Sequence, residues 1–326
     1  MKNRFRYIRF TGIELSPEKL GREPSLSDIV NYSATSSLSV KPQNYISISF
    51  PEETLWLSEE TYKKAKNVFG VCSYEAHEGV GFGVAKGAWL IIGEPQPVSP
   101  PLGVNEECVR VETKLSRALG LPSFIIEKRF VFKGFKGEDI DIGRIKRYRY
   151  FIAAYDRSTG QPLTESQLGN TLLWKNYLSN ERVLKRLGAS SKHLKKDLWE
   201  LERMSLDAMS RYKVVWRDVA KRFIPAVVTD GAVPEHTAHY IVVNSLEEAY
   251  YLSSILLAPQ INAVINEISP WVGHVEPRFI KFFRIPKYDP KNSDHKRLAE
   301  IGREICGKGE DYKKFENEIE GLVSKL

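Results

Sequence analysis

The sequence contains little cysteine and no long apolar run. Its three cysteines, Cys72, Cys108 and Cys306, are far apart and odd in number, so they predict neither a zinc site nor a disulfide framework. This usage is typical of a protein kept in a reducing compartment. No apolar stretch approaches the roughly 20 residues of a membrane span, and the N-terminal residues show no apolar signal region. We therefore expect a soluble, cytoplasmic chain.

The sequence also lacks a strong excess of either charge. Its 48 lysines and arginines exceed the 41 aspartates and glutamates by seven, a balance that permits a polyanionic partner without requiring one. Hydrophobic residues make up 42% of the 326 residues, which is enough for a packed core and excludes a wholly disordered chain. This length favours one large domain or two smaller ones.

Familiar catalytic motifs are missing as well. The glycine-rich stretch Glu78–Gly87 lacks the Gly-Lys-Ser/Thr ending of a phosphate-binding loop, and no clear strand precedes it. Its glycines therefore predict a tight turn where two backbones approach closely. Ser99–Leu102 is similar to the Asn/Asp/Ser-Pro-Pro-aromatic tetrapeptide of amino-methyltransferases, but Leu102 is not aromatic and no cofactor glycines lie upstream. We predict no cofactor.

One enzymatic alternative stays open. Glu112 and Lys114 fit the Glu-x-Lys half of a metal-dependent nuclease site, with Glu94 as a second carboxylate. Two acids would hold magnesium while the lysine assists the attacking water. The Pro-Asp partner of that motif is absent, and His236 and His239 could bind zinc only with ligands from elsewhere. We predict no resident metal and keep magnesium-dependent cleavage as an alternative function.

The pattern of apolar residues predicts a mixed α/β fold of the α+β kind. Strands are expected at Asn44–Phe50, Ser123–Phe132 and Arg147–Asp156, where β-branched and aromatic residues dominate. A helix should follow Ser58, and the proline-rich stretch Gly93–Gly103 should be a loop. We expect a twisted, mostly antiparallel sheet with flanking helices and a helical C-terminal extension.

Two helices are expected near the C-terminus. The first should begin at Ser245, where Glu248 completes a capping box, and could run to Ile268. In the last helix apolar residues recur every three or four positions, which predicts a seam for a helix of the same chain or of a partner. The residues of this seam are Tyr312, Phe315, Ile319, Leu322 and Leu326. A scaffold that binds proteins through this helix is a second alternative function.

The segment Gly143–Asp156 interleaves basic and aromatic residues. Neighbouring residues of a strand point to opposite faces, so Arg147 and Arg149 would share one face, and Tyr148 and Tyr150 the other. The basic face could then bind phosphates while the aromatic face packs on a core. A solvated basic surface without a ligand is the alternative interpretation.

The segment Tyr212–Val228 mixes apolar residues with cations. Its apolar residues fit two short strands that are joined by the charged stretch Arg217–Arg222. Such a hairpin would contribute its apolar side chains to a core. We expect its cations to stand at the rim of that core, where they could meet a polyanion.

Five segments in this order resemble the target-recognition region of adenine-N6 DNA methyltransferases, above all that of the large fused restriction-modification enzymes. They correspond to a glycine turn leading into a strand, a basic-aromatic stretch, a helix joined to a Val-Trp-Arg strand, a strand with a long helix, and a terminal turn and helix. The segments are Glu78–Ile91, Phe135–Leu168, Leu201–Val228, His236–Ile265 and Ile285–Ile301. The likeness spans roughly residues 75–304, and the catalytic half of the family is absent.

The resemblance implies a module that reads double-stranded DNA, while a separate methyltransferase subunit, with or without a nuclease, makes and breaks bonds. We expect an N-terminal α/β segment (residues 1–70) of unknown role, a recognition domain (residues 71–290) and a helical extension (residues 291–326). Lysines and arginines would neutralise phosphates, and other side chains would read base edges. The predicted DNA-binding residues are Arg144, Lys146, Arg147, Arg149, Lys213, Arg217, Lys221, Arg222, His236 and His239.

Overall fold

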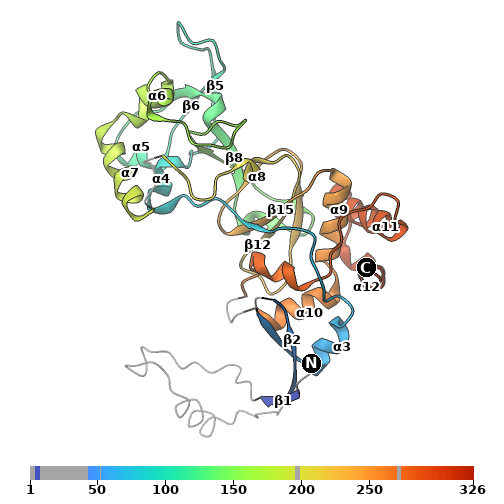
Figure 1. The fold of residues 1–326 in the computed structure, drawn as a ribbon. Helices are drawn as coiled ribbons and strands as arrows, with labels where there is room; N and C mark the ends of the chain where they lie inside the picture. Colours follow the sequence, from blue (N-terminus) through green and yellow to red (C-terminus); the bar gives the residue numbers. More distant parts are fainter. Residues whose placement is uncertain (1–3, 8–42, 52, 195–198, 270–272) are drawn as a thin grey trace, which may run out of the picture. The chain divides into compact units, whose positions relative to one another are not determined.

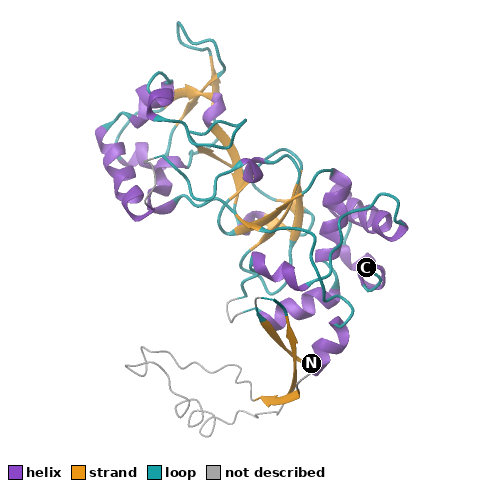
Figure 2. Ribbon diagram, viewed as in Figure 1, coloured by secondary structure: helices purple, strands orange, loops and turns teal. Residues whose placement is uncertain are grey.

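The structure, a computed structural model, describes residues 4–7, 43–51, 53–194, 199–269 and 273–326. The chain divides into two compact units, Met1–Asn67 and Val68–Leu326. Both combine helices with strands, and all ladders between the named strands of the described residues are antiparallel except one (Figures 1 and 2). The predicted mixed α/β class is confirmed, although the strands form several small sheets. Within the same residues, no helix is both long and apolar enough to cross a membrane.

The first unit is a three-stranded antiparallel sheet followed by a helix. Its strands, in the order of the sheet, are β1 (Arg4–Tyr7), β2 (Gln43–Ser49) and β3 (Thr54–Ser58). In β3, Leu55 and Leu57 are buried while their neighbours face water, as expected when one face of a strand is covered. The Ser58 hydroxyl accepts a hydrogen bond from the Thr61 N–H and caps α3 (Glu59–Ala65). The strand and the helix predicted here are confirmed.

The second unit contains four sheets among its described residues, with strand orders β13-β12-β15-β4, β11-β8-β14, β5-β6-β7 and β10-β9. Their strands are β4 (His77–Glu78), β5 (Gln96–Val98), β6 (Cys108–Val111), β7 (Phe124–Glu127), β8 (Val131–Phe135), β9 (Ile140–Asp141), β10 (Arg144–Ile145), β11 (Arg149–Ile152), β12 (Lys213–Arg217), β13 (Pro225–Val228), β14 (Val233–Pro234) and β15 (Ala238–Val242). The parallel ladder joins β8 to β14.

The helices of the second unit are α4 (Lys86–Trp89), α5 (Lys114–Ala118), α6 (Glu165–Leu168), α7 (Glu181–Leu194), α8 (Leu206–Met209), α9 (Leu246–Leu256), α10 (Pro259–Ile268), α11 (Ser293–Gly302) and α12 (Glu316–Val323). Short 3-10 turns lie at Gly83–Ala85, Lys128–Phe130, Gly137–Asp139 (η3), Pro277–Phe282 and Tyr312–Phe315, and π-helical turns at Trp174–Leu178 and Arg303–Gly307.

Two local predictions are wrong. The strand expected after the glycine turn is instead α4, and Leu90 and Ile91 behind it make only single bridges to other segments. A short apolar run fits a buried helical turn as well as a strand, so its sequence does not separate the two. The loop expected at Gly93–Gly103 contains the short strand β5. Proline is tolerated there because β5 is an edge strand, where an N–H can be missing on the open side.

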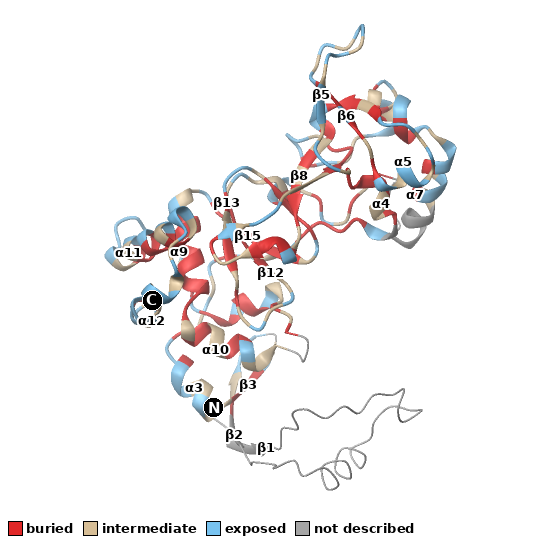
Figure 3. Cartoon of the chain, turned by 180° about the vertical axis from the view of Figure 1, so that it is seen from behind, coloured by how far each residue is buried: buried red, intermediate tan, exposed pale blue. Residues whose placement is uncertain are grey.

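The β12–β13 hairpin predicted from Tyr212–Val228 is confirmed, with β12 inside the largest sheet and β13 at its edge. β12 pairs with β13 on one side and with β15 on the other. Its residues Val214, Val215 and Trp216 are fully buried. Figure 3 colours the buried segments of the chain red. The Trp216 indole N–H donates to the Val275 carbonyl at 2.8 Å, which satisfies the polar atom of this buried ring.

Helix α9 is buried on almost all sides because sheet and helices cover it together. It contacts β12 and β13 as well as α11, which lies beside it (Figure 1). A Cβ atom on Gly302 of α11 would lie 2.1 Å from the Tyr250 carbonyl oxygen, so only glycine permits this close crossing. The Ser254 hydroxyl donates to the Leu298 carbonyl at 2.8 Å across the same contact.

The single long helix expected from Ser245 is wrong in its length and its cap. Pro259 lacks an N–H and begins a new helix, α10, so α9 ends at Leu256. The Ser245 hydroxyl accepts from the Glu248 N–H as predicted, but the Glu248 carboxylate accepts from Asn244 instead of completing the box.

The apolar seam of the last helix is used within the second unit. Ile319 and Leu322 of α12 are buried, and α12 packs against α9, α10 and α11. Residues 291–326 therefore belong to the same compact unit as the sheets. The separate roles predicted for the three regions of the chain stay predictions.

Candidate nucleic-acid interface

Three loops that are far apart in the sequence meet beside the central sheet. They are the glycine-rich loop Glu78–Gly87, the turn η3 and the loop Glu235–Ala238. Hydrogen bonds join these loops: the Val80 N–H donates to the carbonyl of Pro234, just before the third loop (2.8 Å), the His236 N–H to the Val80 carbonyl (2.9 Å) and the Gly137 N–H to the Thr237 hydroxyl (2.9 Å). The chain thus brings together the glycine loop and the segment around His236, which the sequence separates by about 150 residues.

Glycine is required where these loops touch. A Cβ atom on Gly79 would lie 2.3 Å from the Glu235 carbonyl oxygen, and one on Gly137 would lie 2.0 Å from the Thr237 carbonyl oxygen. Real side-chain carbons do not come so close to backbone atoms, so any other residue would push the loops apart. The interpretation of the glycine-rich loop as a close approach of two backbones is confirmed.

Beside this junction, the buried Asp139 binds two of the predicted arginines. Its carboxylate, only 3% exposed, accepts a hydrogen bond from Arg147 Nε at 3.1 Å and another from Arg149 Nη1. It also accepts the Lys136 backbone N–H at 3.0 Å. Glu138 lies above this group and accepts from Arg149 Nη2 at 2.8 Å. Arg147 and Arg149 therefore share a partner, although only Arg149 lies in the strand β11.

A second carboxylate, Asp141, binds three more of the predicted cations. It lies 3.8 Å from Arg144, 3.4 Å from Lys146 and 3.5 Å from Arg217, measured between the charged atoms. Arg217 also donates from Nη2 to the Ile140 carbonyl, which ties β12 to the β9–β10 hairpin. The bonds of Asp139 to Arg147 and Arg149 are charge-assisted and directional, whereas Asp141 forms looser ion pairs with its three cations.

We call this group of side chains the arginine cluster. It consists of Lys136, Glu138, Asp139, Asp141, Arg144, Lys146, Arg147, Arg149 and Arg217. Six cations face three carboxylates, so the cluster keeps a formal charge of +3. Its surface is a mosaic of donors and acceptors and not a uniform positive field. The three acids were not predicted from the sequence, although they stand directly before the basic run, separated from it by the turn at Gly143.

Two predicted contact residues are wrong because they are buried. Lys213 has no exposed surface, and its ammonium group donates to the Ser210 carbonyl. Burial lowers the pKa of Lys213 to about 7. His239 is also buried, with Nε2 lying 3.2 Å from the Asp218 carboxylate. Neither side chain is exposed to solvent.

The remaining three predicted residues lie outside the arginine cluster. Lys221 is exposed on the β12–β13 loop. Arg222 places its guanidinium group 4.6 Å from the centre of the Tyr312 ring, a cation–π contact. His236 is exposed on the loop that meets the glycine turn, with Nδ1 lying 3.4 Å from the carboxylate of the buried Glu235.

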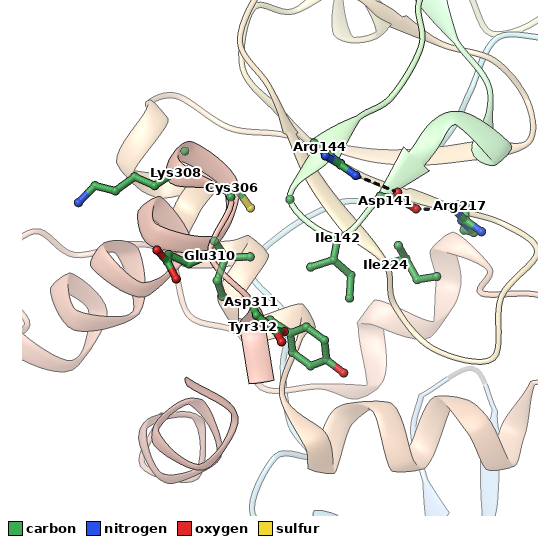
Figure 4. A pocket seen from close by; sticks show the side chains of 14 residues that line it. Asp141, Ile142, Arg144, Arg217, Ile224, Cys306, Lys308, Glu310, Asp311 and Tyr312 are labelled. Atoms are coloured by element: carbon green, nitrogen blue, oxygen red, sulfur yellow. Dashed lines mark hydrogen bonds and ion pairs between the residues drawn. The ribbon is translucent and has the colours of Figure 1, made fainter. Parts of the chain in front are cut away.

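A cleft of about 760 Å³ opens between the β9–β10 hairpin and the C-terminal stretch Ile305–Tyr312 (Figure 4). The hairpin supplies Asp141, Ile142 and Arg144 to one wall, and Arg217 lies beside them. The charged residues of its lining are three cations and three carboxylates, namely Arg144, Arg217, Lys308, Asp141, Glu310 and Asp311. With its charges balanced, the cleft by itself does not favour an anion.

In the alternative nuclease site, the Glu112 carboxylate is bound to an arginine. The Glu112 carboxylate accepts two hydrogen bonds from Arg117, at 3.0 and 2.6 Å, and these lower its pKa. Lys114 begins α5, whose cap is Thr113. In the described residues no group of three or more His, Cys, Asp or Glu side chains is arranged to hold a metal ion. The magnesium-dependent function stays an untested alternative.

No family model matches the chain, and no curated protein matches it in sequence. Two solved structures of restriction-modification enzymes align with it. The DNA complex of the type IIL enzyme MmeI aligns over 88% of this chain with 9% identity and a TM-score of 0.41. The type IIG restriction endonuclease BpuSI aligns over 84% with 13% identity and a TM-score of 0.38. The chain spans 40% and 35% of the length of these two proteins.

Proposed function

We propose that this chain is the DNA-recognition module or subunit of a restriction-modification system and does not catalyse a reaction by itself. A separate adenine-N6 methyltransferase subunit, with or without a nuclease, would act on the DNA that it binds. The ordered resemblance of five segments to a target-recognition region motivates this proposal. The observation that carries it is the arginine cluster, where five of the predicted cations gather on one hairpin and the strands beside it.

The chemistry of the cluster suits a duplex better than a simple anion. A net charge of +3 attracts the polyanion and releases counterions when phosphates are neutralised. The carboxylates between the cations would be a disadvantage for a site that only binds phosphates. They suit a surface that also faces base edges, because the edges offer donors as well as acceptors.

The experiment is a binding titration of double-stranded DNA across a series of salt concentrations. The affinity of the wild-type chain should fall steeply as salt rises. Arg144→Ala, in a side chain that is 74% exposed, should lower the affinity and reduce the slope against salt by about one, the loss of one phosphate contact.

Lys63→Ala is the matched control, because this lysine is 71% exposed and pairs loosely with Glu59 at 3.3 Å on α3 of the first unit. It should leave both the affinity and the slope unchanged. Absence of binding to any duplex pool, or an affinity that salt does not alter, would refute the proposed function.

A further inference from the structure

Arg147 is bound through Nε, while its two outer nitrogens make no hydrogen bond to the described residues. Its Nε donates to Asp139 at 3.1 Å, while the side chain remains 63% exposed. Of its outer nitrogens, Nη2 lies 3.6 Å from the Glu138 carboxylate, which is longer than a hydrogen bond. The two outer nitrogens are therefore a pair of parallel donors that remain available to a ligand.

Asp139 is well suited to fix this direction. The carboxylate is buried, and it is tied to the backbone at Lys136 and to the mostly buried side chain of Arg149. The Lys146 N–H also donates to the Asp139 carbonyl at 2.7 Å, which closes the β9–β10 hairpin over the residue. A guanidinium group fastened through Nε to such a support loses little further freedom when it binds a ligand.

The neighbouring Glu138 carboxylate decides what kind of ligand the two outer nitrogens of Arg147 can bind. Glu138 is 61% exposed and stands beside the outer edge of Arg147, so a phosphate bound there would meet a like charge. Two neutral acceptors side by side meet no such repulsion. In a DNA duplex, the O6 and N7 atoms of guanine form that pair in the major groove.

We infer that Arg147 reads a guanine through its two outer nitrogens and that Asp139 is the positioning residue that aims it. This inference rests on the proposed function and changes the role expected of Arg147 from a phosphate contact to a base contact. Arg149 is not a second reader, since both of its outer nitrogens are already bound to Asp139 and Glu138. Arg144, whose one carboxylate partner among the described residues is Asp141 at 3.8 Å, keeps the role of a phosphate contact.

The test selects bound duplexes from a pool with randomised central base pairs, using the full chain and four variants: Arg147→Ala, Arg147→Lys, Asp139→Asn and Arg144→Ala. The wild type should enrich a motif that contains guanine. Both Arg147 variants should lose the preference for one guanine by roughly 10-fold or more, because lysine keeps the charge but not the two parallel donors. Arg144→Ala should weaken all duplexes by the same factor.

Asp139→Asn tests the positioning role. Asparagine still accepts the Lys136 N–H but loses the charge that holds Arg147, so selectivity at the same guanine should fall while the slope against salt stays unchanged. A merely structural role would weaken all duplexes alike. Thermal unfolding shows whether this variant is folded, and if it is not, the two Arg147 variants decide the inference.

The outcomes separate the two proposals. A wild type that binds no duplex, or that enriches no motif, refutes the proposed function itself. A wild type that enriches a motif which Arg147→Lys retains in full overturns only the inference, since charge alone would then be sufficient. Equal weakening of all duplexes by Arg147→Ala would likewise make Arg147 a phosphate contact.

Discussion

Replacing Lys213 with methionine should stabilise the protein, most strongly below pH 7. Lys213 is fully buried in β12, between Val228 of β13 and Val242 of β15. Burial lowers its pKa from the ordinary 10.5 to about 7, and the charge of Asp230 only partly opposes this. Methionine has a similar length and shape and carries no charge, so it can fill the same space.

The expected size follows from the difference between the two pKa values. In the unfolded chain the lysine is protonated up to about pH 10.5, and in the folded chain only up to about 7. Between these values the unfolded state binds more protons, so folding stability rises with pH; below pH 7 the full cost of the buried charge is present. That cost is at most about 5 kcal/mol. The substitution leaves the Ser210 carbonyl without its donor, which costs about 1–3 kcal/mol.

The assay is urea denaturation of the wild type and Lys213→Met at several values between pH 6 and pH 9. Near pH 6 the variant should be more stable by up to about 2–4 kcal/mol, and the gap should shrink towards pH 9. Tyrosines and cysteines that titrate at high pH are common to both proteins, so their effects cancel in the difference. Lys63→Met, at an exposed position, should show no such gap. A variant that is less stable at pH 6, or a gap that pH does not change, would refute the reasoning.

Three further outcomes are expected. Gly137→Ala should destabilise the protein by more than about 1 kcal/mol, because its Cβ would lie 2.0 Å from the Thr237 carbonyl oxygen. The control Gly321→Ala in α12, with open space around it, should be neutral or stabilising. Thermal unfolding compares the two variants. Leu102→Ser, at a side chain that is 106% exposed, should change the free energy of unfolding by less than about 0.5 kcal/mol in urea. Plasmid DNA incubated with magnesium and the chain should remain uncut; cleavage that Glu112→Gln abolishes would instead support the nuclease alternative.

The sequence predicted the elements whose local residues decide their structure. The hairpin of β12 and β13 follows from two β-branched runs separated by a charged stretch. The start of α9 follows from the serine cap at Ser245, and that of α3 from Ser58. The break between α9 and α10 was also predictable at Pro259, since proline is favoured at the first position of a helix and marks a new start.

The candidate interface could be predicted only in part, because pairing depends on contacts between distant residues. The basic run at Arg144–Arg149 was visible, but Asp139 and Asp141 bind it only after the chain turns back at Gly143. Arg217 joins them from 76 residues away. The burial of Lys213 could not be predicted either, because the local sequence does not indicate which strands and loops will cover this lysine.

The pairing of β4 with β15 has a consequence for how the chain is made. His77 lies opposite Tyr240, roughly 160 residues later. This edge of the central sheet can therefore form only after most of the polypeptide has left the ribosome. Closing so long a segment is slow. A fragment that begins after Glu78 would leave β15 with an open edge, ready to pair with another chain. Recombinant pieces of this protein should therefore keep the residues around β4, or they will tend to aggregate.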